Sequence, residues 1–112
     1  MTQPPNTTGN PTVRRRSQRV LVQQVVSISF GGDLATAVSE NVSSGGAFIY
    51  CDRFMASGSE VGLVLVLPLE VTQGEPVRVW CICRVVRAEK RLIKGKFGIA
   101  LEFLNFQVLS QA

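Results

Sequence analysis

The sequence predicts an all-β protein: a six-stranded antiparallel β-barrel with a flexible N-terminal arm and at most a short C-terminal helix. Apolar and β-branched residues gather in six short runs. Residues that favour turns separate these runs at intervals of roughly 8 to 14 residues, and no run has the spacing of a long amphipathic helix. In a chain of 112 residues, closing the sheet also removes exposed strand edges.

A glycine turn separates the first two expected strands, and a polar interruption separates the second strand from the third. Val20–Phe30 is rich in β-branched residues, Gly31–Asp33 forms a turn, and Leu34–Glu40 alternates again between apolar and polar positions. Residues 41–46 are polar or very small and end this alternation. Ala47–Cys51 is then expected to form a short strand.

Three further strands follow along the chain. Glu60–Leu67 is strongly apolar and is ended by a proline, Val77–Ala88 is the longest alternation, and Phe97–Leu104 is the final strand. The connections are expected at residues 52–59, 70–76 and 89–95, and residues 105–112 at most form a short helix.

The N-terminal region differs in character from the rest of the chain. Residues 1–13 are polar and contain three prolines, which predicts a disordered lead before a single domain at residues 14–112. This region lacks the basic and apolar parts of a secretory signal, and no apolar run is long enough to span a bilayer. We therefore expect a cytoplasmic protein without membrane insertion.

Histidine and cysteine usage limits the chemistry that is available. The chain has no histidine, the commonest general base and metal ligand, and three cysteines. Cys81 and Cys83 are two residues apart in an expected strand, so they point the same way and are not placed to form a disulfide. Three thiols also fall short of the four ligands of a structural zinc site. We expect Cys81 and Cys83 to be small core residues, and we expect no metal, no cofactor and no enzymatic activity.

The net charge of +4 is concentrated in a cluster of four arginines at Arg14, Arg15, Arg16 and Arg19. Without these four, eight basic and eight acidic residues remain. A nucleic-acid-binding surface spreads basic residues along a face, whereas this cluster suits one small anion. The planar arginine fork pairs with phosphate and with the O6/N7 edge of guanine. A solvated basic tail or a membrane-surface patch would have the same composition.

A second polar feature is Asn41-x-Ser43-x-x-Gly46, which lies between two expected strands. Gly45 and Gly46 allow another molecule to approach the backbone, and successive amides in such a turn bind anions. Asn41 and Ser43 add donors and acceptors that suit a base edge or a phosphate oxygen. The alternative is a hairpin turn in which Asn41 and Ser43 satisfy local backbone groups.

In this order, the two features resemble the signature of the PilZ domain family, RxxxR followed by (D/N)xSxxG. The first motif corresponds to Arg15–Arg19 and the second to Asn41–Gly46. The segment Cys83-Arg84-Val85-Val86-Arg87 is similar to the G-R-V-V-R strand of the family, with Cys83 in place of the glycine. The segment Phe97–Phe103 is similar to its closing strand, and the resemblance covers roughly residues 14–104.

The resemblance implies a stand-alone receptor for cyclic di-GMP, a bacterial second messenger, without catalytic activity. The arginine arm would become ordered over the barrel when the ligand binds and would signal to an unidentified partner protein. Arg15 and Arg19 would grip phosphates and guanine edges, and an arginine at position 14 is compatible with an intercalated pair of messengers. The ligand-binding residues implied are Arg14, Arg15, Arg19, Asn41, Ser43 and Gly46.

Two other functions remain open from the sequence. A domain of this kind can also be a ligand-independent protein adaptor in pilus or flagellar motility, although such domains usually lack one or both motifs. An oligonucleotide-binding barrel would need aromatic stacking platforms, and besides six Phe the only rings are Tyr50 and Trp80. We therefore expect no nucleic-acid polymer as a partner. We expect Trp80 in or near the barrel wall and Arg84 as an exposed strand charge.

Overall fold

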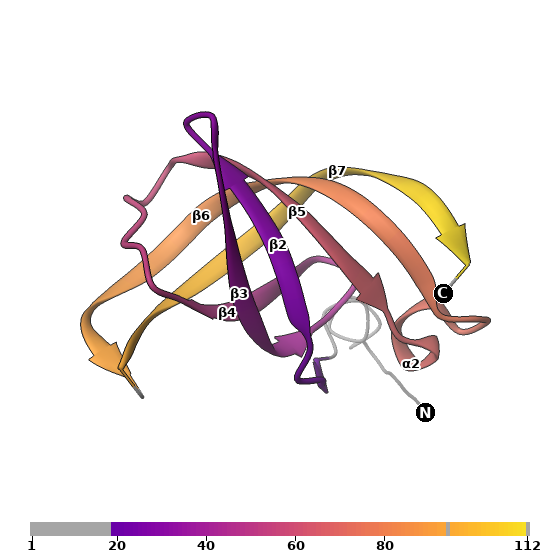
Figure 1. Cartoon of the computed structure of the whole chain (residues 1–112). Coiled ribbons are helices and arrows are strands. Elements are labelled where there is room, and N and C mark those ends of the chain that lie inside the picture. The colour runs from indigo at the N-terminus through magenta and orange to yellow at the C-terminus, as the bar shows by residue number, and fades with distance from the viewer. Residues whose placement is uncertain (1–18, 94, 112) are drawn as a thin grey trace, which may run out of the picture.

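Antiparallel pairing closes the chain into a barrel (Figure 1). The computed structural model describes residues 19–93 and 95–111. Its elements are β1 (Val20–Leu21), β2 (Val25–Phe30), β3 (Asp33–Val42), β4 (Gly46–Cys51), β5 (Glu60–Leu67), α2 (Leu69–Thr72), β6 (Val77–Ile93) and β7 (Lys96–Gln111). The sheet order is β3-β2-β5-β6-β7-β4, with β4 pairing back onto β3 and β1 lying beside β3 as a continuation of β2. The predicted six-stranded barrel is confirmed.

The predicted first strand, Val20–Phe30, is divided into β1 and β2. At the break, the side chain of Gln24 takes the place of a backbone partner for β5. The Gln24 side chain donates to the Val66 carbonyl oxygen at 2.8 Å and accepts from the Val66 amide at 2.9 Å. On the other side, the buried Ser39 hydroxyl donates to the Val22 carbonyl oxygen and accepts from the Gln24 amide. The polar groups at the break are thus paired without a regular strand.

Four of the predicted segments differ in extent or in type from the structure. Residues 89–93, expected in a turn, continue β6, and residues 105–111, expected to be at most a short helix, continue β7. These two extensions are strands because β6 and β7 pair with each other over almost their whole length. Conversely, the predicted loop at residues 70–76 begins inside α2, a single helical turn after Pro68. The polar interruption is also shorter, since β3 extends to Val42 and β4 begins at Gly46.

Alternate residues of the strands fill the barrel. The largest fully buried side chains include Ile28, Ile49, Leu63, Val79 and Ile99. All three cysteines are buried among them, as predicted for Cys81 and Cys83. A hydrogen bond with Cys81, together with burial, raises the pKa of Cys83. These thiols therefore serve as small core residues.

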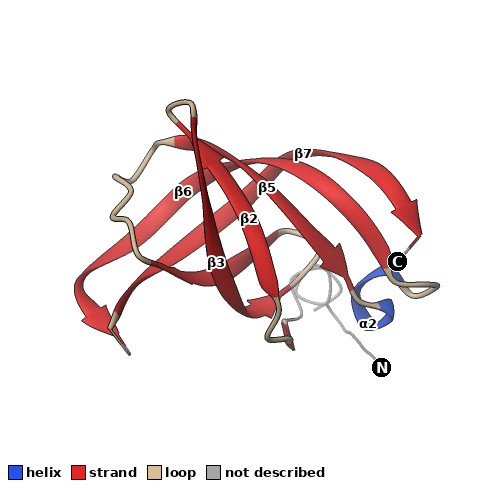
Figure 2. Ribbon diagram, viewed as in Figure 1, coloured by secondary structure: helices blue, strands red, loops and turns tan. Residues whose placement is uncertain are grey.

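Figure 2 shows how completely strands dominate the described chain, with the short α2 at the end of the barrel where β7 finishes. Among the described residues, no helix has the length and hydrophobicity needed to cross a bilayer. The predicted disorder of residues 1–13 concerns a segment outside the described residues.

Leucine truncation at two positions tests the placement of the core. Leu63 is 0% exposed and Leu34 is 79% exposed. Leu63→Ala should lower the free energy of unfolding by about 2–5 kcal/mol, because it leaves a cavity in a packed interior. Leu34→Ala, the matched control, should change it by less than about 0.5 kcal/mol. Urea denaturation measures both values, and equal losses in the two variants would contradict this core.

Candidate functional site

The structure joins the two polar motifs through one hydrogen bond. Arg19 donates from Nη1 to the Oδ1 atom of Asn41 at 2.8 Å, across 22 positions of sequence. The two-residue strand β1 makes this possible, because it pairs Val20 with Val42 and Leu21 with Asn41. Pairing at the end of β3 therefore brings the last arginine of the cluster beside the first residue of the second motif.

A hollow of about 360 Å³ lies at this contact and is lined by Arg19, Asn41, Phe48, Arg87 and Ala100. Four of these residues form one transverse row, because Asn41 pairs with Phe48, Phe48 with Ala100, and Ala100 with Arg87. The row thus crosses β3, β4, β7 and β6 at one level. The small side chain of Ala100 leaves room between its larger neighbours.

The described residues that line the hollow include two arginines and no carboxylate. Arg87 is 63% exposed, and its Nε atom lies 3.5 Å from Oε2 of Glu89. An exposed ion pair of this kind is weak, so the guanidinium can exchange this partner for a ligand. The hollow therefore presents donors and positive charge, a combination that suits an anion.

Ser43 and Gly46 have a different place in the structure. Ser43 is 2% exposed, and its Oγ atom accepts from the amides of Gly45 at 3.1 Å and Gly46 at 3.2 Å. A Cβ atom on Gly46 would lie 2.1 Å from the carbonyl oxygen of Leu101. Gly45 in turn accepts from the Phe103 amide at 2.9 Å. These residues shape the turn that follows Asn41 and fix it against β7.

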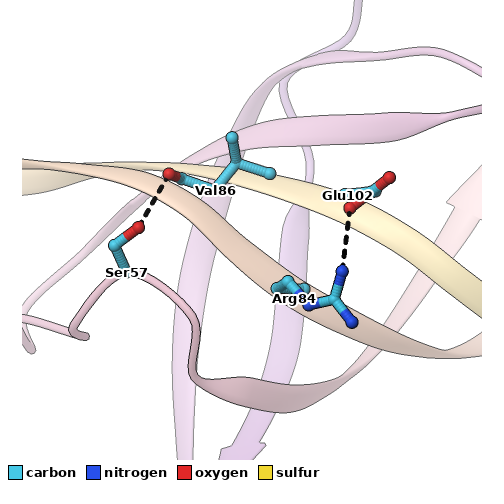
Figure 3. A network of polar contacts seen from close by, with 4 residues as sticks. All are labelled: Ser57, Arg84, Val86 and Glu102. Carbon is cyan, nitrogen blue, oxygen red and sulfur yellow. Dashed lines mark hydrogen bonds and ion pairs between the residues drawn. The ribbon is translucent and has the colours of Figure 1, made fainter.

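Other arginines considered in the sequence analysis are not among the described residues that line the hollow. Arg14 and Arg15 lie outside the described residues. Arg84 lies away from the lining of the hollow, with its Nη1 atom 3.7 Å from Oε1 of Glu102, as Figure 3 shows. It is an exposed strand charge, as expected.

Arg87 was not predicted as a site residue, although it ends the Cys83–Arg87 segment that carries part of the resemblance. A register shift between Val85 and Arg87 places Arg87 opposite Ala100. Local alternation does not reveal this irregularity, so sequence reasoning could not place Arg87 in the row. In Figure 3, the Ser57 hydroxyl donates to the Val86 carbonyl oxygen at 2.9 Å within this shifted region.

Phe48, Tyr50 and Trp80 occupy two separate places on the barrel wall. Phe48 lies in the hollow, with the Tyr50 ring edge-on at 5.4 Å between centroids. The Tyr50 hydroxyl donates to Glu40, and this bond raises the pKa of the tyrosine. Trp80 is 38% exposed and covers Gly62 on the neighbouring strand, outside the hollow. One ring, from Phe48, therefore lines the hollow among the described residues.

Comparisons with known proteins bear on the sequence family and on the fold. The sequence profile of the PilZ domain matches residues 13–111. No curated protein sequence matches the chain.

Two solved structures share the fold. One is the Bacillus subtilis inhibitor of motility (MotI/DgrA), with a TM-score of 0.64, 21% identity, and coverage of 80% of this chain and 42% of that chain. The other is the PilZ domain of CeSA from a cellulose-synthesizing bacterium, with a TM-score of 0.52, 22% identity, and coverage of 79% and 82%. The chain thus spans less than half of the length of the motility inhibitor.

Alanine at the two adjacent glycines tests whether the turn is fixed against β7. Gly46→Ala should lower the free energy of unfolding by about 1–3 kcal/mol, because its Cβ would overlap the Leu101 carbonyl group. Gly45→Ala is the matched control, since its Cβ would lie 4.0 Å from Ser43 Oγ, at ordinary van der Waals distance. Thermal and urea unfolding measure the difference. A Gly46→Ala protein as stable as the Gly45→Ala protein would show that the turn can move away from β7.

Proposed function

The chain belongs to the PilZ domain family, and on this premise we propose that it is a cyclic di-GMP receptor that binds the messenger at the hollow beside Arg19 and Asn41. Domains of this family are binding modules for cyclic di-GMP and are not catalysts. The hydrogen bond between Arg19 and Asn41 is the observation that carries the proposal, because it unites both signature motifs at one hollow.

The chemistry of the hollow suits this ligand. Cyclic di-GMP offers two phosphates and two guanine O6/N7 edges, which are the acceptors that arginine forks bind. Arg19 has five N–H donors and bonds Asn41 through Nη1, so one guanidinium can hold Asn41 and a ligand together. Arg87 approaches from the opposite end of the row, and Phe48 and Ala100 lie between the two arginines.

The proposal assigns different tasks to the residues of the second motif. Asn41 contacts a guanine directly, because its side chain lines the hollow. Ser43 and Gly46 contribute through the turn, since the Ser43 hydroxyl already accepts from two backbone amides and Gly46 packs against Leu101. Their substitution would displace Asn41 rather than remove a ligand contact.

Arg14 and Arg15 complete the ligand contacts in this proposal. Arg15 precedes Arg19 by four positions, and the arm orders over the hollow when the phosphates are bound. Arg14 adds a further fork beside them, which suits an intercalated pair of messengers. A stoichiometry of two nucleotides per chain is therefore expected.

The output of the receptor is an interaction with a partner protein. A small binding module that does no chemistry must act through a surface that changes when the ligand binds. The likeness to an inhibitor of motility makes motility proteins the first class of partner to test. A ligand-independent adaptor in pilus or flagellar assembly is the alternative, and messenger binding separates the two.

Substitutions in the arm test the proposed receptor. Arg15→Ala and Arg19→Ala should each abolish measurable binding, because each removes charge-assisted bonds to phosphate or guanine. Arg53→Ala is the matched control, since Arg53 is an exposed arginine that pairs with Asp33 away from the hollow. Titration calorimetry with cyclic di-GMP gives affinity and stoichiometry, and thermal melting shows whether each barrel is folded. Unchanged affinity in both arm variants, or no heat with the unaltered chain, would refute the receptor.

Arg87 supplies a separate prediction about the far end of the row. Arg87→Ala should weaken cyclic di-GMP binding by about tenfold to a hundredfold, the effect of losing one or two charge-assisted hydrogen bonds. Arg84→Ala is the control from the same strand, because Arg84 pairs with Glu102 outside the hollow. The same calorimetric titration compares the two variants. Equal affinities would mean that the ligand does not extend along the row to β6.

A further inference from the structure

One end of β7 has an edge along which no other strand of the described residues pairs. The pairing of β7 with β4 ends where Gly46 meets Glu102, and the bond from the Phe103 amide to Gly45 is the next contact on that side. From residue 104 onward, β6 is the only described strand that pairs with β7, and it lies on the opposite side of β7. We name residues 104–110 the β7 edge. Such an edge presents unpaired N–H and C=O groups that can template another strand.

The composition of the β7 edge favours pairing with another strand, because it lacks the residues that usually prevent such pairing. Natural edges are usually blunted by charged residues, prolines or bulges. Residues 103–111 contain no charge, no proline and no glycine. Register shifts against β6 leave Leu104 and Leu109 without a pair, at the two ends of the edge, while residues 105–108 between them pair regularly. Four apolar side chains of the edge are exposed: Leu104 at 38%, Phe106 at 49%, Val108 at 59% and Leu109 at 49%. Neutral, apolar strands without proline are those that associate most readily.

An apolar groove lies directly beside this edge. It has a volume of about 250 Å³, and Phe106 and Val108 form one wall. Ser44, from the turn between β3 and β4, lies on its rim, and Val71 of α2 lines it from the helix. A strand added to the β7 edge would begin where the turn ends and would cover the side chains that line this groove.

We propose that the β7 edge pairs with the β7 edge of a second copy of this chain, in an antiparallel dimer. A two-fold axis through the middle of the edge makes the two strands antiparallel. The backbone N–H and C=O groups of each strand can then hydrogen-bond to those of the other. Because both edges are uncharged, no like charges meet across the contact.

The N-terminal lead of the same chain is the other possible partner for the β7 edge, but its composition does not suit a paired strand. Residues 1–18 carry Pro4, Pro5 and Pro11, which have no N–H to donate, and three arginines. Their apolar side chains other than proline are Met1 and Val13. A second copy offers a matching uncharged strand, so it is the better complement. This inference does not depend on the proposed ligand and is tested without nucleotide.

Charge substitutions at Gln107 test the dimer. Gln107 is exposed, pairs with Trp80 and is the midpoint of the β7 edge, so its two copies would meet near the axis. Sedimentation of the full chain should show a dimer that dissociates on dilution. Gln107→Lys should raise the dissociation constant of the dimer by about tenfold or more, because two like charges are brought together, and Gln107→Glu should do the same. An equimolar mixture of the two variants should restore dimers that contain one chain of each.

The matched control is Ser27→Lys, which places the same charge on an exposed position of β2, a strand paired on both sides. It should leave the dimer intact, and thermal melting should show all three variants folded. Hydrogen exchange should also be slower at residues 104–110 when the chain is concentrated. A chain that stays monomeric at millimolar concentration, a dimer indifferent to both Gln107 substitutions, or variants that fail to pair when mixed would each overturn the proposal.

Discussion

The ladder between β4 and β7 is the constraint on which the rest of the structure depends, because it closes the barrel. The two strands pair from Gly46 with Glu102 to Cys51 with Phe97. At its first pair the backbones approach so closely that no side chain fits at position 46. Without this closure, β3 and β6 would not be linked through β4 and β7, and the row from Asn41 to Arg87 would not exist. Fold and hollow therefore share one physical origin.

The closure also explains why one short motif combines exposed and buried residues. Asn41 precedes the turn and lines the hollow, whereas Ser43 and Gly46 are buried in the turn itself. The hydroxyl of Ser43 accepts from the amides of Gly45 and Gly46, and the second of these amides is buried. The residues of this motif act together, because Asn41 lines the hollow only where the turn places it. Loss of function at a buried member then reports on geometry rather than on a lost contact.

Much of the fold could be predicted from the sequence, because alternation between apolar and polar positions is a local signal. It identified the six strands and the burial of Cys81 and Cys83. What it could not provide depends on partners distant in sequence. Residues 105–111 are strand because β6 lies beside them, and the break after Leu21 exists because Gln24 reaches Val66. Arg87 was missed for the same reason, since a register shift between paired strands has no local signature.

The distribution of charge links the hollow to the remainder of the surface. Several cations of the barrel lie beside carboxylates: Arg53 beside Asp33, Arg84 beside Glu102, and Lys96 beside Asp52. In each pair the carboxylate offsets the positive potential of the cation, so an anion is attracted only weakly to these three positions. Arg19 instead bonds the neutral amide of Asn41, and its positive charge is not cancelled by that partner. Arg19 therefore leaves uncompensated positive charge at the hollow, at the place where the first strand begins.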